Sequence, residues 1–148
     1  MLNEFKDAFR KPNNAHAQLI IINVVVFLVL GVLYVFLTAS GNGLVFKAIH
    51  NQLSIPATLQ DFVLKPWTLI TYAFVHDLSG IFHILFNMLA FYWFGKLFVE
   101  YLGSDKLIAV YVLGALAGAF FYLLVYNLVP FYKGQIPADG MVANSALV

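Results

Sequence analysis

The feature that most constrains this chain is the segment 19–39, an almost unbroken run of apolar residues in which Asn23 is the one strongly polar side chain. As a helix, a run of this length reaches about 30 Å, the thickness of the hydrocarbon core of a bilayer. A cleaved signal peptide has a shorter apolar region, with a small-residue cleavage site soon after it. The run therefore predicts a transmembrane helix.

Two further apolar segments, 80–102 and 107–129, have the same character. The chain is 62% hydrophobic and 10% charged, whereas a soluble domain is about 45–50% apolar and about 25% charged. A short turn at 103–106 makes the helices on either side antiparallel, and Gly114 and Gly118 favour close helix packing. We predict an all-α fold, a polytopic membrane helical bundle with three transmembrane helices.

The segment 40–79, between the first two spans, contains too many polar residues to cross lipid. Its aromatic content is nevertheless too high for a free loop, and Trp and Tyr favour the membrane interface. We expect an ordered loop that is partly sunk in the interface. The charged segment 1–18 predicts a cytoplasmic tail or a short interfacial helix.

Several kinds of partner are not indicated by the sequence. The net charge is +1, without a basic stripe, so we expect no nucleic-acid partner. The chain has no cysteine, which excludes disulfides, thiolate catalysis and zinc–sulfur sites. His76 and Asp77 could suggest a metal site but lack a third ligand. No motif indicates a cofactor, and we expect neither a metal nor a cofactor.

The distribution of lysine and arginine near the helix ends predicts the orientation, because cytoplasmic loops carry an excess of these residues. One side of the membrane would hold Lys6, Arg10, Lys11, Lys96 and Lys106, and the other would hold Lys47, Lys65 and Lys133. We therefore predict a multi-pass protein with a cytoplasmic N-terminus. The segment 40–79 and the C-terminal residues would then lie outside.

Two polar residues of the second span are candidates for chemistry. His83 and Asn87 are four residues apart, so they share one face of a helix. As hydrogen-bond donors they are suited to stabilising an oxyanion. Alternatively, they form hydrogen bonds between helices, each worth about 0.6 kcal/mol on average. These residues alone leave both interpretations open, whereas Asn23 of the first span predicts an interhelical hydrogen bond.

The sequence around the pair follows a recognisable pattern. Residues 66–76 read Pro-Trp-Thr-Leu-Ile-Thr-Tyr-Ala-Phe-Val-His, and residues 82–87 read Phe-His-Ile-Leu-Phe-Asn. They are followed by Gly95, Glu100, Leu102-Gly103-Ser104, Gly114 and Gly118. Together these elements resemble the first half of a rhomboid intramembrane serine protease. The resemblance covers residues 19–148, so the segment would be a partial rhomboid domain, with the first three of six core helices.

The resemblance implies a serine endopeptidase that cleaves transmembrane segments of membrane proteins with a Ser–His dyad. In the family, the serine lies in a G-x-S-x element that starts the fourth helix, and the general-base histidine lies in the sixth. The family's H-x-x-x-N pair, matched here by His83 and Asn87, helps to form the oxyanion hole. Its first loop, matched by 40–79, lies sideways in the outer leaflet. The implied partners are the lipid bilayer and transmembrane protein substrates, and the oligomeric state is left open.

The chain departs from the family pattern near its C-terminus. Ala143-Asn144-Ser145-Ala146 has alanine where the family has glycine, and no histidine matches the base position. Ser145 is either a degenerate nucleophile or a loop residue. We expect the nucleophile and the base to lie beyond Val148, so the 148-residue chain alone should be inactive. Two alternatives stay open, a non-catalytic rhomboid-like protein that binds clients and a small three-helix membrane scaffold.

The predicted orientation can be tested with reporter fusions. A reporter fused after Gly103 should read as cytoplasmic, and one fused after Tyr132 should read as external, because an odd number of spans separates Tyr132 from the N-terminus. A reporter whose activity depends on its compartment gives the measurement. The opposite location at either fusion point would contradict the orientation.

Overall fold

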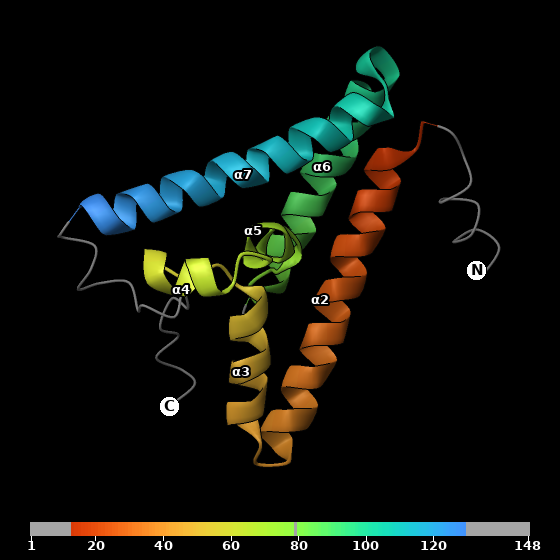
Figure 1. The fold of residues 1–148 in the computed structure, drawn as a ribbon. Coiled ribbons are helices and arrows are strands. Elements are labelled where there is room, and N and C mark those ends of the chain that lie inside the picture. The colour runs from red at the N-terminus through yellow and green to blue at the C-terminus, as the bar shows by residue number, and fades with distance from the viewer. Residues whose placement is uncertain (1–12, 79, 130–148) are drawn as a thin grey trace. The chain divides into compact units, whose positions relative to one another are not determined.

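Three long helices dominate the computed structural model, which describes residues 13–78 and 80–129. They are α2 (Ala15–Ala39), α6 (Ile81–Leu102) and α7 (Ser104–Leu128), labelled in Figure 1. Each is long and apolar enough to cross a membrane, and no strand occurs in the described part of the chain. The all-α fold and the three predicted apolar helices are confirmed, and the chain is an integral membrane protein.

Two of these helices begin before the apolar runs that predict them. α2 begins at Ala15 rather than Leu19, and α7 begins at Ser104 rather than Leu107. An apolar run marks the part of a helix that matches the hydrocarbon, whereas polar residues also form first turns. Asp105, in the first turn of α7, interacts favourably with the free N–H groups there.

Some predicted features lie outside the described residues. Residues 1–12 of the predicted N-terminal tail are among them, and residues 15–18, which were also assigned to that tail, belong to α2. Residues 130–148 are also outside, including Ser145.

The segment between α2 and α6 is folded into short helices. They are α3 (Gly43–Leu53), α4 (Leu59–Leu64), α5 (Thr68–Thr71) and the 3-10 helix η1 (Tyr72–Phe74). A glycine in the left-handed region, Gly41 (φ 76°), ends α2 before them. The N–H of Gly41 donates to the carbonyl of Thr38, and that of Asn42 donates to Leu37, which is a Schellman C-cap.

The described residues form two compact units. The first contains α2 as far as Val32, together with residues 76–113, which include α6 and the start of α7. The second contains residues 33–75, with the short helices, and the remainder of α7.

In the first unit, α2 and α7 are joined by a buried amide. Asn23 is 1% exposed, and its Nδ2 donates to the carbonyl of Leu19 at 2.8 Å and to the hydroxyl of Tyr111 at 3.1 Å. The Tyr111 hydroxyl in turn lies 3.3 Å from Oδ1 of Asn23. The predicted interhelical hydrogen bond is confirmed. Both ends of the amide find partners, which a polar group in an apolar environment requires.

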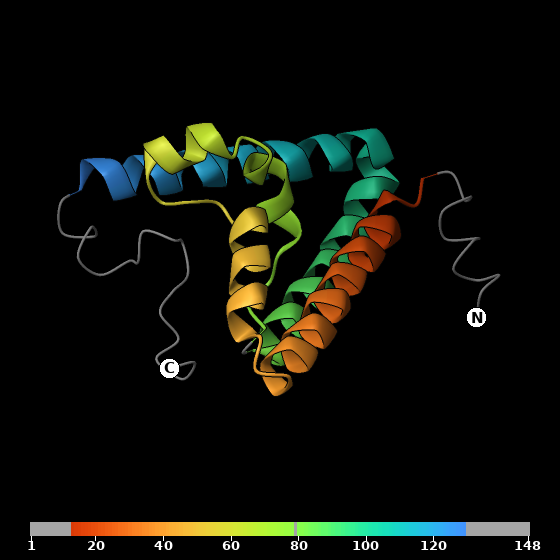
Figure 2. The same ribbon diagram turned by 60° about the horizontal axis from the view of Figure 1, so that its bottom comes forward.

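The N-terminal part of α2 packs against α6, beside which it lies in both Figure 1 and Figure 2. Ala15 forms a small buried cluster with Val99 of α6 and Leu107 of α7. The backbone N–H of Ala15, which has no partner within its own helix, donates to Oγ of Ser104 at 3.2 Å. The side chain that begins α7 thus caps the first turn of α2.

In the second unit, Tyr72 of η1 connects the short helices to α7. Its hydroxyl donates to the backbone carbonyl of Ala115. A Cβ atom on Gly118 would lie 3.1 Å from this hydroxyl, whereas one on Gly114 would meet nothing within 4 Å. Burial raises the pKa of the Tyr72 phenol, which favours the protonated form that donates this hydrogen bond. Gly118 therefore makes room for a tyrosine, and the two glycines do not act as one helix-packing face in the described part of the chain.

The C-terminal end of α3 is capped by side chains of the following segment. The last four carbonyls of a helix lack partners within that helix. Three of the terminal carbonyls of α3 accept hydrogen bonds: Asn51 from Lys65 Nζ (3.4 Å), Gln52 from Trp67 Nε1 (2.8 Å) and Leu53 from Thr71 Oγ1 (2.7 Å). These bonds hold α3 and α5 together, and the position of this segment in the membrane interface stays a prediction.

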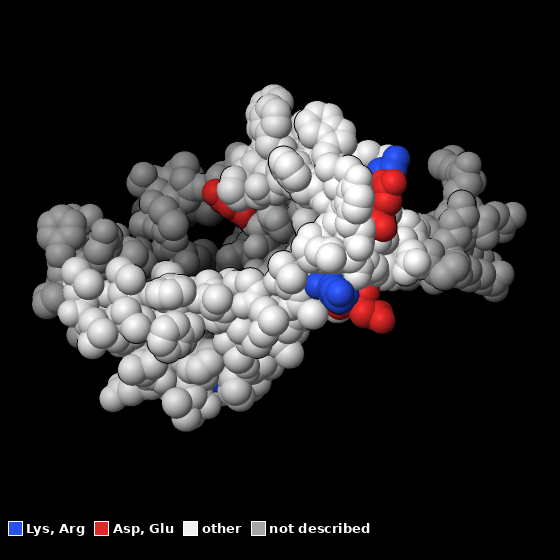
Figure 3. Space-filling model, turned by 90° about the horizontal axis from the view of Figure 1, so that it is seen from above, with Lys and Arg blue, Asp and Glu red and all other residues white. Residues whose placement is uncertain are grey.

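Large apolar side chains remain exposed along all three long helices. Charged side chains form only a few small groups on the face that Figure 3 shows. Soluble proteins rarely expose apolar patches of this extent. Lipid contact accounts for the surface, because apolar side chains lose nothing by facing hydrocarbon.

We expect the two glycines of α7 to respond differently to alanine. Gly118→Ala should destabilise the protein by up to about 1 kcal/mol relative to Gly114→Ala, because the new Cβ pushes the Tyr72 hydroxyl aside and weakens its hydrogen bond. Unfolding in mixed micelles by a denaturing detergent measures the difference. In a Tyr72→Phe background the two substitutions should become equivalent, and a persistent difference would show that Gly118 contacts something else.

Candidate functional site

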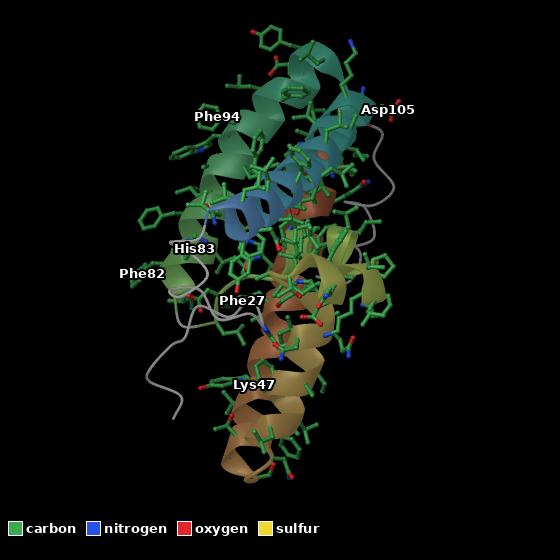
Figure 4. All side chains as sticks on the ribbon, turned by 60° about the vertical axis from the view of Figure 1, so that its left-hand side comes forward. Phe27, Lys47, Phe82, His83, Phe94 and Asp105 are labelled. Carbon is green, nitrogen blue, oxygen red and sulfur yellow. The ribbon has the colours of Figure 1, made fainter. Side chains whose placement is uncertain are left out.

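The two predicted site residues lie at the N-terminal end of α6. The helix begins at Ile81, and the backbone N–H of His83 donates to the carbonyl of Gly80 at 2.9 Å. His83 is thus in the first turn, and Asn87 follows one turn later. Figure 4 shows His83 at this end of α6, with Phe94 further along the helix. The helix places both side chains on one face, as their spacing predicts.

The side chains of the pair contact each other directly. Nδ2 of Asn87 lies 3.1 Å from Nε2 of His83. An amide nitrogen only donates, so with the amide in this orientation Nε2 accepts, and the proton of the neutral imidazole is on Nδ1. The second N–H of Asn87 and the Nδ1–H of His83 are then left for other partners. The pair therefore offers two hydrogen-bond donors at one end of one helix.

Both side chains are exposed in the described part of the chain, in contrast to the buried Asn23. Within this part, their only hydrogen bond is to each other, and neither bonds to another helix. Pairs of this kind on a helix surface are worth only about 0.2–0.5 kcal/mol. The pair therefore does not hold α6 to the other described helices, although its catalytic role stays a prediction.

A third side chain, His76, lies beside the pair. Its ring centroid is 6.4 Å from that of His83, and the ring planes are tilted by 56°. His76 lies in the segment between η1 and α6 and is partly buried. His76 belongs to the motif quoted above, but the sequence predicts a water-facing loop tip there and no role at the site. Its position just before α6 was the one sign that it could lie near His83. Residue spacing in a loop, unlike spacing in a helix, does not show which side chains lie on the same side.

One serine of the described residues contacts a histidine. Oγ of Ser54 lies 3.1 Å from Nδ1 of His50, four residues earlier on α3. Ser54 is the residue that ends this helix, and its backbone N–H donates to the carbonyl of His50. The contact therefore belongs to the cap of α3, and the family pattern does not place the nucleophile there.

The described residues do not group three or more His, Cys, Asp or Glu side chains in a way that would hold a metal ion. The second unit contributes the contacts described above for Tyr72 and the end of α3, which are structural. The pair in α6 and the adjacent His76 are thus the candidate site.

Comparison with known proteins identifies the segment that contains this site. The sequence model of the Rhomboid domain matches residues 64–137, which include His76, His83 and Asn87. The chain is also 41% identical over 70 residues to "RHOMBOID-like protein 12, mitochondrial" of Arabidopsis thaliana. That match covers 46% of this chain and 20% of the relative, so the chain spans about a fifth of the relative's length. No solved structure matches.

Proposed function

Because the chain belongs to the rhomboid family, we propose that it is part of an intramembrane serine endopeptidase that cleaves transmembrane segments of membrane proteins. The observation that carries the proposal is the contact between His83 and Asn87 at the start of α6, within the segment that the family model matches. We propose that this pair stabilises the oxyanion of the reaction.

The chemistry requires hydrogen-bond donors at one place. When a serine oxygen attacks a peptide carbonyl, the carbonyl oxygen becomes negatively charged in the tetrahedral intermediate. Donors fixed beforehand near that oxygen stabilise the intermediate more than the substrate, which raises the rate. The second N–H of Asn87 and the Nδ1–H of His83 supply such donors. In the family, the serine begins the fourth helix and the base lies in the sixth.

The exposure of the pair supports a role that needs access. A histidine and an asparagine that faced hydrocarbon would lose hydrogen bonds to water at considerable cost. A wet cavity beside the N-terminal end of α6 would avoid that cost. The same cavity would admit the water that hydrolyses an acyl-enzyme.

The proposal also includes the orientation and the partners. The N-terminus would be cytoplasmic, by the distribution of lysine and arginine. The N-terminal end of α6 would then lie near the outer face of the membrane. The substrates would be transmembrane segments of other proteins, which reach the site from the lipid bilayer.

The role of the pair is tested by comparing two asparagines in the protein expressed from its own gene. Asn87→Ala should lower kcat by about 10²-fold, with little change in thermal stability, because Asn87 is exposed and would act on the transition state. Asn23→Ala is the matched control, because Asn23 is buried and bonded to Tyr111. It should lower the melting temperature and leave turnover per folded molecule near that of the wild type.

Cleavage of a transmembrane substrate in proteoliposomes and thermal unfolding of the same preparations give both quantities. Unchanged turnover in Asn87→Ala would remove the proposed catalytic role. If the wild type binds a transmembrane client without cutting it, and a fluorophosphonate probe labels no serine, the protein is instead a non-catalytic client-binding member of the family.

A further inference from the structure

The site contains a side chain whose role the proposed function does not assign. The ring of His76 lies 6.4 Å from that of His83, within the range in which tilted aromatic rings pack favourably. His76 is partly buried, whereas His83 and Asn87 are exposed. All three belong to the same compact unit, although His76 comes from the segment before α6.

The pair needs a further contact to hold one arrangement. Hydrogen-bonded pairs four residues apart on a helix surface are individually weak. An exposed imidazole also has several staggered χ1 rotamers and a broad χ2 range. Only some of these orientations direct Nε2 toward Asn87. A ring packed against the imidazole excludes some of the other orientations and so favours the observed contact between His83 and Asn87.

We propose that His76 is a positioning residue, whose ring holds the imidazole of His83 in the orientation that directs Nε2 toward Asn87. The consequence for catalysis rests on the proposed function, whereas the orientation itself does not. The proposed role depends on the shape of a flat ring and not on its nitrogen atoms. Phenylalanine should therefore replace His76, and a residue without a ring should not.

The orientation is measured without any assay of activity. The protein is expressed from its own gene with ¹⁵N-labelled histidine and placed in lipid nanodiscs, at a pH where imidazole is neutral. In the wild type, the two-bond ¹H–¹⁵N correlations of His83 should show mainly the Nδ1–H tautomer, because Nε2 accepts from Asn87. His76→Ala and His76→Gln should lose this preference, and His76→Phe should keep it.

His50→Ala is the matched control. It removes another histidine ring, one that contacts Phe46 and Ser54 in the second unit, so it should leave the His83 signals unchanged. The two variants that lack a ring at position 76 are independent, so either one that folds decides the result. A wild-type tautomer for His83 in such a variant would overturn the proposal.

Turnover supplies the second measurement. In proteoliposomes, His76→Ala should lower kcat by about tenfold and leave KM within about twofold, because misplaced donors mainly affect the transition state. His76→Phe should stay within about twofold of the wild type. Equal losses in both variants would show that His76 acts through its nitrogens, which contradicts positioning. An inactive wild type with the expected tautomer pattern would refute the proposed function and leave this inference intact.

Discussion

The need of polar groups for hydrogen-bond partners within the chain governs this fold. A group that enters hydrocarbon cannot turn to water, so a partner within the chain avoids a large cost. The amide of Asn23 reaches Tyr111, the hydroxyl of Tyr72 reaches a backbone carbonyl of α7, and the carbonyls that end α3 are capped by side chains of the next segment. Apolar contacts alone leave many registers of neighbouring segments nearly equal in energy. Within each compact unit, a polar contact favours one register of the segments that it joins, α2 with α7 in the first unit and η1 with α7 in the second.

The sequence predicted those features that depend on local pattern. A long apolar run is recognised from its own residues, so the three long helices were predicted, as was the bonding of Asn23 to another helix. Its partner was not predicted, because Tyr111 is 88 residues away. The short helices of the segment 40–79 were not predicted; α3, for example, ends where side chains 14 to 18 residues further along bind its last carbonyls. Gly118 was interpreted as a packing residue because glycine spacing does not reveal that a tyrosine hydroxyl fills the space.

The candidate site, too, was predictable only where it depends on a regular helix. His83 and Asn87 could be paired from sequence because a regular helix places residues i and i+4 together. The hydrogen bond between them, and the tautomer of His83 that it implies, are seen only in the structure. His76 could not be assigned to the site in advance, because it belongs to an irregular segment whose backbone path sequence spacing does not define. Sequence reasoning therefore finds the members that share an element and misses those that a loop supplies.

The two asparagines of the long helices show why exposure carries the functional argument. Asn23 gains stability for the fold because both ends of its amide are bonded and water is excluded. Asn87 has the same side chain but gains little, since its contact with His83 is exposed and weak. Leucine at position 87 would suit a lipid-facing helix better. An asparagine at this position is less favourable in hydrocarbon than leucine, and it does not join two described helices. Such local costs in free energy are expected at functional sites. A group that acts on a transition state must be held in place with a donor still accessible to the substrate, whereas a group that holds helices together needs no such access.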